Sequence, residues 1–432
     1  MRPQVRCQGM ICHPLSGERK RHIGEPCGMK VVILSSLSWS LINFRGALIA
    51  RMVEAGHDVV ACAPDGEPEV IGALSKMGVR FRLTPMARAG TNPLRDTWTF
   101  FHYWRLLRSE RPDVVVAYTQ KPIIYGGLAT RLLGRARFYA IMSGLGYVFS
   151  TEADSRPLLR STVSRLYRLG VRRAECIFVF NGDDRRLMLE NGIVAPDQPV
   201  MQVPGSGIDT AHFAQQPLPD GPPTFLMMGR LMRDKGVGEY VEAARIVRET
   251  RPDVRFMLLT RPETENPTGY TAQDLDAWRR AGLIEFVPET RDVRPFIAAA
   301  HVFVLPSFYR EGLPRTILEA LATGRPVITT DMPGCREPIE EGVNGLLIPP
   351  RDAPALAAAM THLLDNPDLL AAMAQAARQK AIDIYDVDKV NRLLMEVLGL
   401  SKAATAPVAA WTTEPGPPVL KALPGRRSAA EA

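Results

Sequence analysis

Apolar runs alternate with amphipathic stretches along most of this chain. In the first half, short and mainly β-branched runs occupy residues 30–36, 58–64, 79–83, 113–119, 137–143 and 176–181. Stretches with a helical spacing of apolar residues lie between them, at 47–55, 67–76, 94–109 and 125–133. Apolar strands separated by helices are typical of a parallel sheet that is covered on both faces. The pattern therefore predicts an α/β, Rossmann-like domain.

A second series of the same kind follows a segment rich in glycine and proline. Its expected strands are residues 223–231, 254–260, 284–288, 301–307, 325–331 and 344–350. Further helical patterns cover residues 353–364, 367–382 and 386–398. Two facing Rossmann-like domains leave a cleft between the carboxyl ends of their strands, and open α/β sheets bind ligands at that edge. The active site is therefore expected in an interdomain cleft.

These patterns divide the chain into six segments. In order, we expect a disordered extension (1–28), an N-terminal Rossmann-like domain (29–203), a linker (204–222), a C-terminal Rossmann-like domain (223–382), a helix that returns to the first domain (383–400) and a disordered tail (401–432). The stretch that starts at Met29 resembles a natural first strand, whereas the final segment of Ala, Pro and Gly has too little apolar surface to form a core.

The composition is that of a globular protein, with 46% hydrophobic and 23% charged residues. No apolar run approaches the length of about eighteen residues that spans a bilayer, and the N-terminus lacks the apolar core of a secretory signal. We therefore expect a cytoplasmic enzyme. Three of the six cysteines crowd the first 27 residues with two histidines, but their spacing fits no zinc pattern, so no metal site is expected there.

The net charge of +7 is divided unevenly. Residues 1–202 carry 28 basic and 17 acidic side chains, whereas residues 203–432 carry 25 and 29. A basic first half suits an anionic partner such as a membrane, a phosphate group or a nucleic acid. The two domains are therefore expected to bind different partners.

The segment "EGLPRTILEALATGRP" carries two acids, Glu311 and Glu319. Taken alone, it is most simply a solvated helix face. In its setting, however, Glu311 lies in the loop after a strand. The backbone N–H groups between Gly312 and Arg315, where Pro314 has none, are free donors at a helix N-terminus that suits a phosphate. Glu319 lies further along the helix, where a carboxylate accepts two hydroxyl groups of a vicinal diol. This combination suits a nucleotide sugar.

The segment "MGRLMRDKG" ends the first strand of the second domain and carries Arg230 and Lys235. These cations are placed to neutralise a diphosphate leaving group in the same cleft. An ordinary basic surface turn explains the segment equally well when it is taken alone. Its pairing with the acidic helix motif favours the functional interpretation.

Both segments resemble the donor-binding domain of retaining, family-4-type GT-B glycosyltransferases, whose Glu-x7-Glu signature matches Glu311 and Glu319. The resemblance covers about residues 30–398. It implies that Arg230 and Lys235 hold the donor diphosphate, that Glu311 contacts the sugar hydroxyls and that Glu319 contacts the ribose. It also implies that the backbone of Gly312, Leu313 and Pro314 lines the sugar-phosphate site. Glu311, Arg230 and Lys235 are the implied catalytic residues.

The first domain resembles the subgroup that extends polyprenyl-diphosphate-linked sugars in bacterial glycan assembly. The resemblance lies in "NFRG", "YTQKPIIYGGLATR" and "SGLGYVF". It implies a lipid-diphosphate acceptor on this side of the cleft, near Asn43, Arg45 and Lys121. Many relatives place a histidine after the fourth strand, whereas this chain has Thr119 and Gln120 there, so no catalytic histidine is assigned.

The activity implied by the resemblance is transfer of a hexose-type sugar from a UDP-sugar, with retention of the anomeric configuration. The departing phosphate is then able to accept the acceptor's proton. We assign no Asp-x-Asp pair to a metal, so we expect no cofactor and no metal. A GDP-sugar donor stays open. Two other enzyme functions also stay open on this fold, a nucleotide-sugar epimerase and a transferase to a soluble acceptor.

Two segments of the basic half predict contact with an anionic membrane. Residues 92–113 concentrate aromatic side chains beside arginines, and residues 155–175 set arginines among leucines. A basic amphipathic helix suits a membrane interface, although a helix packed on its own sheet with a charged outer face explains the arginines equally well. We expect about half of the aromatics in the core. A nucleic-acid-binding function is opposed by the acidic second half.

Overall fold

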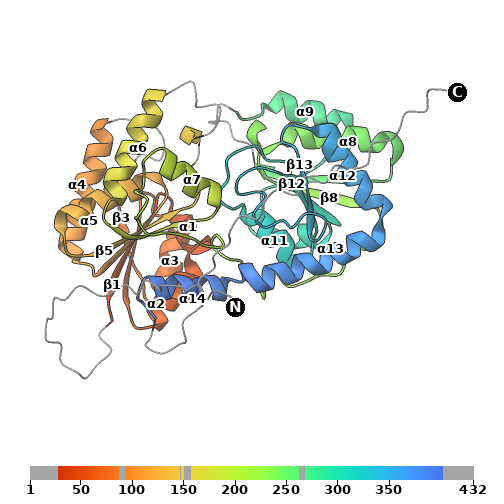
Figure 1. The fold of residues 1–432 in the computed structure, drawn as a ribbon. Coiled ribbons are helices and arrows are strands. Elements are labelled where there is room, and N and C mark those ends of the chain that lie inside the picture. The colour runs from red at the N-terminus through yellow and green to blue at the C-terminus, as the bar shows by residue number, and fades with distance from the viewer. Residues whose placement is uncertain (1–27, 87–92, 146, 150–156, 262–267, 402–432) are drawn as a thin grey trace, which may run out of the picture.

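The computed structural model describes residues 28–86, 93–145, 147–149, 157–261 and 268–401. They form two α/β domains side by side, the first drawn red to yellow-green and the second green to blue in Figure 1. The expected extension of residues 1–28 and the tail of residues 401–432 lie almost wholly outside the described residues. The prediction of two Rossmann-like domains is confirmed.

The first domain is built on a seven-stranded parallel sheet with the order β3-β2-β1-β4-β5-β6-β7. Its strands are β1 (Lys30–Leu34), β2 (Asp58–Ala63), β3 (Arg80–Leu83), β4 (Val114–Tyr118), β5 (Arg137–Met142), β6 (Ala174–Val179) and β7 (Val200–Gln202). The six predicted strands are all present. The edge strand β7 was not predicted, because three half-buried residues make too short a run to produce a pattern.

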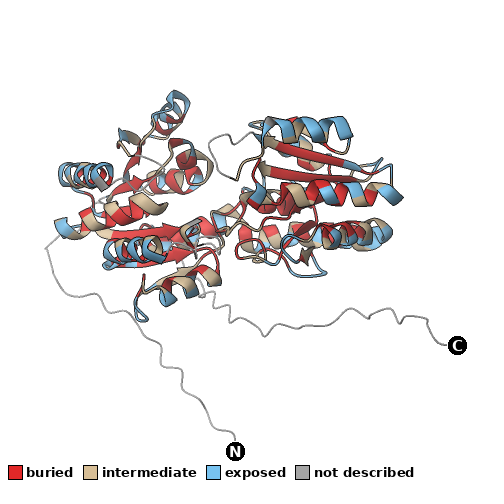
Figure 2. Ribbon diagram, turned by 90° about the horizontal axis from the view of Figure 1, so that it is seen from above, coloured by how far each residue is buried: buried red, intermediate tan, exposed pale blue. Residues whose placement is uncertain are grey.

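Helices cover both faces of this sheet, and Figure 2 shows buried strands between helices with exposed outer sides. One face carries α1 (Ser38–Asn43), α2 (Gly46–Glu54), α3 (Pro68–Lys76) and α14 (Val387–Val397). The other carries α4 (Pro93–Glu110), the short π-helix η1 (Pro122–Gly126), α5 (Gly127–Leu133), α6 (Pro157–Val171) and α7 (Gly182–Glu190). Each face has its own apolar core, as a sheet apolar on both sides requires.

The second domain repeats the same topology with a six-stranded parallel sheet in the order β10-β9-β8-β11-β12-β13. Its strands are β8 (Thr224–Arg230), β9 (Arg255–Arg261), β10 (Glu285–Pro288), β11 (Val302–Leu305), β12 (Val327–Thr330) and β13 (Gly345–Ile348). Its helices are α8 (Val237–Thr250), α9 (Ala272–Ala281), α10 (Arg294–Ala298), α11 (Arg315–Thr323), α12 (Ala353–Asp365) and α13 (Pro367–Lys380). All six predicted strands are present.

The strand order reverses between β1 and β4 in the first sheet and between β8 and β11 in the second. The connections that leave two such neighbouring strands run to opposite faces of the sheet, which opens a crevice at their carboxyl ends. The loops after these four strands are therefore the ones that the topology assigns to ligands. Arg230, Lys235 and Glu311 belong to the β8 and β11 loops, and Arg45 and Lys121 to those of β1 and β4.

The last helix, α14, belongs to the core of the first domain although it follows the second domain in the chain (Figure 1). Val390, Leu394 and Leu398 are buried against the α1–α3 side of the first sheet. The imidazole of His57 is also hydrogen-bonded to the carbonyl of Leu400 at 2.8 Å. The chain therefore crosses between the domains twice.

In the described part of the chain, no helix is both long and apolar enough to cross a membrane.

Candidate active site between the domains

The β8 loop brings Lys235 against the end of β11. Arg230 ends β8, and Lys235 ends a short 3-10 helix, η4 (Arg233–Lys235). The next residue, Gly236, has φ = 77°, and a Cβ there would overlap the carbonyl group of Pro306 just after β11. Only glycine permits this left-handed turn at such close range. The two loops that flank the reversal point are therefore in direct contact.

Lys235 and Glu311 form an ion pair between their Nζ and Oε1 atoms. Their side chains are only 13% and 12% exposed, and Ser307 Oγ donates a hydrogen bond to the same carboxylate oxygen at 3.0 Å. Charge-assisted hydrogen bonds of this kind are short and strong, particularly away from water. The two predicted donor-site residues thus act as one unit, a pairing that the spacing in the sequence did not reveal.

The loop after Glu311 leads into α11, whose N-cap is Pro314. The helix begins at Arg315, one residue later than a proline in the first turn would place it, and it ends at Thr323 with Gly324 as its C-cap. The amides of the first turn have no partner within the helix and carry the positive end of its dipole. Gly312, Leu313 and Pro314 therefore present backbone groups beside the Lys235–Glu311 pair.

Glu319 lies one turn into α11 and is paired with Arg315, its Oε1 atom lying 3.1 Å from Arg315 Nε. Burial raises the pKa of Glu319 to about 7, and the neighbouring Arg315 partly opposes that rise. Arg315 also donates to the backbone carbonyl of Asn43 in the first domain and lies over the ring of Phe44. The predicted ribose-binding acid is thus linked through Arg315 to the predicted acceptor side.

Arg230 lies at the carboxyl end of β8, next to Arg261 in the neighbouring strand. Its side chain has no hydrogen-bond or ion-pair partner among the residues that the structure describes, and it is half-buried. A guanidinium at this edge is placed to meet an anion bound in the crevice between β8 and β11.

The donor loop at 311–314 is pressed against two segments of the first domain. A Cβ on Gly312 would overlap the carbonyl group of Ser143 and lie 2.9 Å from the nitrogen of Gly144. A Cβ on Gly205, in the connection between the domains, would lie 2.6 Å from Leu313. The domains therefore meet directly at the loop that carries Glu311.

The junction between the 311–314 loop and the first domain is also held by polar contacts, which the sequence analysis did not predict. Asn181 Nδ2 donates to the backbone carbonyls of Glu311 and Gly312, at 3.3 and 2.9 Å. The guanidinium of Arg310 pairs with Asp184 at 3.1 Å, and Asp184 is fully buried. Burial raises the pKa of Asp184, and Arg310 opposes that rise. The available signal was an N-cap pattern directly after β6, since Asn181 caps α7 by accepting from the Asp184 amide at 2.7 Å.

The three predicted acceptor-side residues differ in exposure. Asn43 ends α1 and is half-buried. Lys121 pairs with Asp96 of α4 at 2.6 Å, and both side chains are nearly covered. Arg45 is only 4% exposed, lies over the rings of Tyr118 and Phe180, and has its pKa lowered to about 10 by burial. Arg45 therefore lies beneath the surface of the junction and not in an open loop.

Backbone strain marks the end of β4. Thr119 has φ = 71°, a conformation that is rare for a β-branched residue. Its hydroxyl is buried and has no hydrogen-bond partner among the described residues. Strain and unpaired polar atoms of this kind cluster at functional sites. Thr119 directly follows β4, at the point where the strand order of the first sheet reverses.

Two family models match this chain on either side of the interdomain connection. The "Glycosyl transferase 4-like domain" matches residues 44–205, and "Glycosyl transferases group 1" matches residues 209–380. The two matches together cover most of both domains. The chain therefore belongs to the family-4-type GT-B glycosyltransferases.

Several curated relatives extend over most of the chain. A Campylobacter jejuni protein, N,N'-diacetylbacillosaminyl-diphospho-undecaprenol alpha-1,3-N-acetylgalactosaminyltransferase, is 24% identical over 83% of this chain and 95% of its own length. An Escherichia coli protein, UDP-Gal:alpha-D-GlcNAc-diphosphoundecaprenol alpha-1,3-galactosyltransferase, is 26% identical over 74% and 84%. The sequence resemblance to glycosyltransferases of lipid-linked sugars is thereby confirmed.

Solved structures agree on the fold. The Anabaena protein HepE in complex with UDP superposes with a TM-score of 0.69 at 19% identity, over 86% of this chain and all of the other. Sucrose-phosphate synthase from Thermosynechococcus elongatus superposes with a TM-score of 0.68 at 17% identity, over 86% of this chain and all of the other.

Proposed function

We propose that this glycosyltransferase moves a hexose-type sugar from a UDP-sugar to a polyprenyl-diphosphate-linked saccharide, with retention of the anomeric configuration. The observation that carries the proposal is the contact between Lys235 and Glu311 at the point where the strand order of the second sheet reverses. Beside them lies the N-terminus of α11. The relatives that act on undecaprenyl-diphosphate-linked sugars support the acceptor class.

In the proposed reaction, the bond between the sugar's anomeric carbon and the diphosphate breaks while the acceptor oxygen bonds to the same carbon from the same face. The departing diphosphate gains negative charge and takes the proton of the acceptor hydroxyl. Arg230, Lys235 and the first amides of α11 stabilise that charge, without a metal ion in our proposal. Glu311 orients the sugar through its hydroxyls.

The Lys235–Glu311 pair also suits this role before the donor arrives. An ammonium group has three donors, so Lys235 is able to hold Glu311 and a phosphate oxygen at the same time. Ser307 fixes the other side of the carboxylate at 3.0 Å. The cation is therefore oriented in advance and needs little reorganisation during the reaction.

We further propose that the enzyme works as a peripheral protein at the cytoplasmic face of the cell membrane, and does not bind nucleic acid. Of the aromatics on α4, Tyr103 is in the core, whereas Trp98 and Phe101 are 59% and 57% exposed. Leu158, in the first turn of α6, is 83% exposed. Exposed apolar side chains among arginines suit an anionic bilayer surface.

The direct test incubates the protein with a radiolabelled UDP-sugar, with and without a polyprenyl-diphosphate-linked saccharide in vesicles. We expect label in the lipid fraction only when both substrates are present. An epimerase would convert the donor without any acceptor, and a soluble-acceptor enzyme would transfer equally well to a water-soluble saccharide. Either result would contradict the proposal. The anomeric proton coupling in the product reports retention, and a parallel GDP-sugar series tests the donor nucleotide.

The pKa of Glu319 leads to a second expectation, on donor binding. Ribose hydroxyls donate to the carboxylate form, so a bound UDP-sugar lowers the pKa of Glu319 from its value of about 7. Below pH 7 the donor must then displace a proton, and its affinity should fall by up to tenfold per pH unit. Above pH 7 the affinity should stay constant. Calorimetric titration between pH 5.5 and 8 measures this dependence.

Glu319→Gln is the matched control, because it keeps the shape of the side chain and removes the titration. The variant should bind the donor more weakly than the wild type at pH 8 and show no dependence on pH. An equal pH dependence in the two proteins would exclude Glu319 as the ribose-binding acid.

A further inference from the structure

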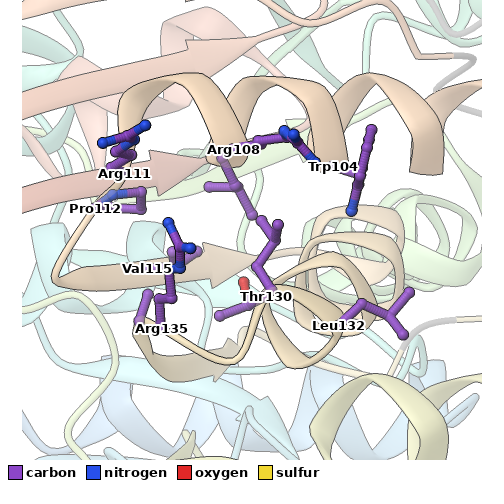
Figure 3. Close-up of a pocket in the computed structure, with 11 residues that line it drawn as sticks. Trp104, Arg108, Arg111, Pro112, Val115, Thr130, Leu132 and Arg135 are labelled. Carbon is purple, nitrogen blue, oxygen red and sulfur yellow. The ribbon is translucent and has the colours of Figure 1, made fainter.

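A cavity of about 330 Å³ lies between α4 and α5 in the first domain, away from the domain junction (Figure 3). Its lining includes Pro112, two residues before β4, and Ala136, directly before β5. These residues mark the edge of the sheet where strands begin, whereas the candidate active site follows the edge where strands end. The cavity is therefore a separate site.

Part of the lining of this cavity is cationic. Arg108, Arg111 and Arg135 contribute to it, and no Asp or Glu is among the lining residues. None of the three arginines forms a salt bridge with any residue that the structure describes. Arg108 also lies over the ring of Trp104, at 5.3 Å from its centre, which is within the range of a cation–π contact. Three uncompensated guanidinium groups are suited to a phosphate.

The rest of the lining is mostly apolar. Trp104, Leu107 and Leu133 contribute to it, and Leu132, also in the lining, is 61% exposed. A free phosphate or other small inorganic anion has no apolar part that would contact such a surface. An amphiphile with an anionic head and hydrocarbon chains matches this mixed cationic and apolar lining.

The cavity also continues the exposed stripe of α4. Leu94, Trp98, Phe101, Arg105 and Arg108 are all exposed and follow the helical spacing, so they lie along one side of the helix. The stripe is apolar in its first half and basic in its second, where it reaches the cavity. A bilayer that contacts the apolar half would place its headgroups beside the arginines.

We propose that this cavity binds the phosphate headgroup of an anionic membrane phospholipid, with the guanidinium groups of Arg108, Arg111 and Arg135 on the phosphate and Leu132 beside the first part of the chains. Such a site gives the enzyme a fixed orientation on the bilayer. Its occupancy is independent of donor binding and of sugar transfer, since none of its residues lies at the domain junction.

Sedimentation with vesicles tests the site, using phosphatidylglycerol mixed into phosphatidylcholine. Arg108→Gln/Arg135→Gln removes two charges inside the cavity. Arg105→Gln/Arg165→Gln removes two exposed charges from α4 and α6 outside it. General attraction to an anionic surface is worth about 1 kcal/mol per basic residue, or about fivefold, and affects both pairs alike. We expect the cavity pair to lose at least tenfold more affinity than the control pair. Equal losses would overturn the proposal.

A titration in solution distinguishes the source of the phosphate. Monomeric dihexanoyl phosphatidylglycerol should change Trp104 emission saturably in the wild type, and the change should be absent in Trp104→Phe and in the Arg108→Gln/Arg135→Gln variant. Glycerol 3-phosphate and inorganic phosphate should bind at least tenfold more weakly. Equal binding of the headgroup alone would replace the lipid site with a soluble-phosphate site, and no saturable change with any probe would exclude an anion site.

Sugar transfer to a diphosphate-linked saccharide with a short alkyl chain, used below the concentration at which it forms micelles, should be equal in the wild type and in Arg108→Gln/Arg135→Gln. This result separates the two proposals: the cavity can fail the lipid tests while transfer persists, and transfer can be absent from a protein whose cavity binds the lipid.

Discussion

Replacing Lys235 by methionine is expected to lower the turnover number for sugar transfer by about 10²–10³, because the developing charge on the diphosphate loses a preorganised cation. The same change leaves the nearly buried carboxylate of Glu311 without its partner. Removal of one member of a buried pair typically costs about 3–5 kcal/mol of stability. A loss of activity in this single variant therefore has two explanations, catalytic and structural.

A double-variant cycle separates them. Glu311→Gln keeps the size of the side chain and its ability to accept the hydrogen bond from Ser307. In Lys235→Met/Glu311→Gln no buried charge is left unpaired, so the unfolding free energy should return close to the wild-type value. Transfer should stay at or below the level of the Lys235→Met variant. Activity and denaturant unfolding are measured on all four proteins.

Recovery of transfer together with stability in the double variant would show that the pair is structural only. Recovery of stability alone would support the proposed roles of Lys235 and Glu311 in the chemistry.

Replacing Gly312 by alanine should separate the two domains at the donor loop. The added methyl group would overlap the Ser143 carbonyl group, and both contacting groups are backbone, which cannot move aside as a flexible side chain does. The hydrogen bonds from Asn181 to the carbonyls of residues 311 and 312 would lengthen as well. A displacement of about 1 Å at a reacting centre costs on the order of 10² in rate. We expect that loss in transfer with both domains still folded.

Small-angle scattering measures the separation of the domains, and the transfer assay measures the loss of activity. Gly72→Ala is the control. Gly72 lies inside α3, and a Cβ there meets nothing within 4 Å. That variant should keep wild-type activity and gain slightly in stability, since alanine is the better helix former. Full transfer by the Gly312→Ala variant would show that the close approach of the loops is not required for the reaction.

Strand positions were largely predictable here because parallel strands covered on both faces are apolar throughout. All twelve predicted strands occur, and among the strands of the described residues only the three-residue edge strand β7 was not predicted. Helix boundaries followed from prolines at helix starts and glycines at helix ends, as at Pro314 and Gly324. These features depend on neighbours in the sequence, so the sequence carries them directly.

The contacts at the domain junction were not predictable in the same way. Asn181 precedes Glu311 by 130 residues and Asp184 precedes Arg310 by 126, and nothing in either local pattern indicates the other. The sequence likewise suggested an accessible Arg45, which the fold places under Tyr118 and Phe180. Burial of a charged residue depends on what packs over it, which local pattern does not determine.

By itself, the sequence determined the fold class, the two-domain division and the segments that carry Arg230, Lys235, Glu311 and Glu319. The periodicity of strands and helices, and the glycines and prolines at their ends, are local properties of the sequence. The tertiary structure decided which of these groups are partners. Lys235 pairs with Glu311, Glu319 with Arg315, and Lys121 with Asp96. It also decided that an arginine of α4 and two arginines that follow α4 and α5 line one cavity. Distances between side chains from different loops arise only when the two sheets are assembled, since the reversal of strand order brings those loops to one crevice.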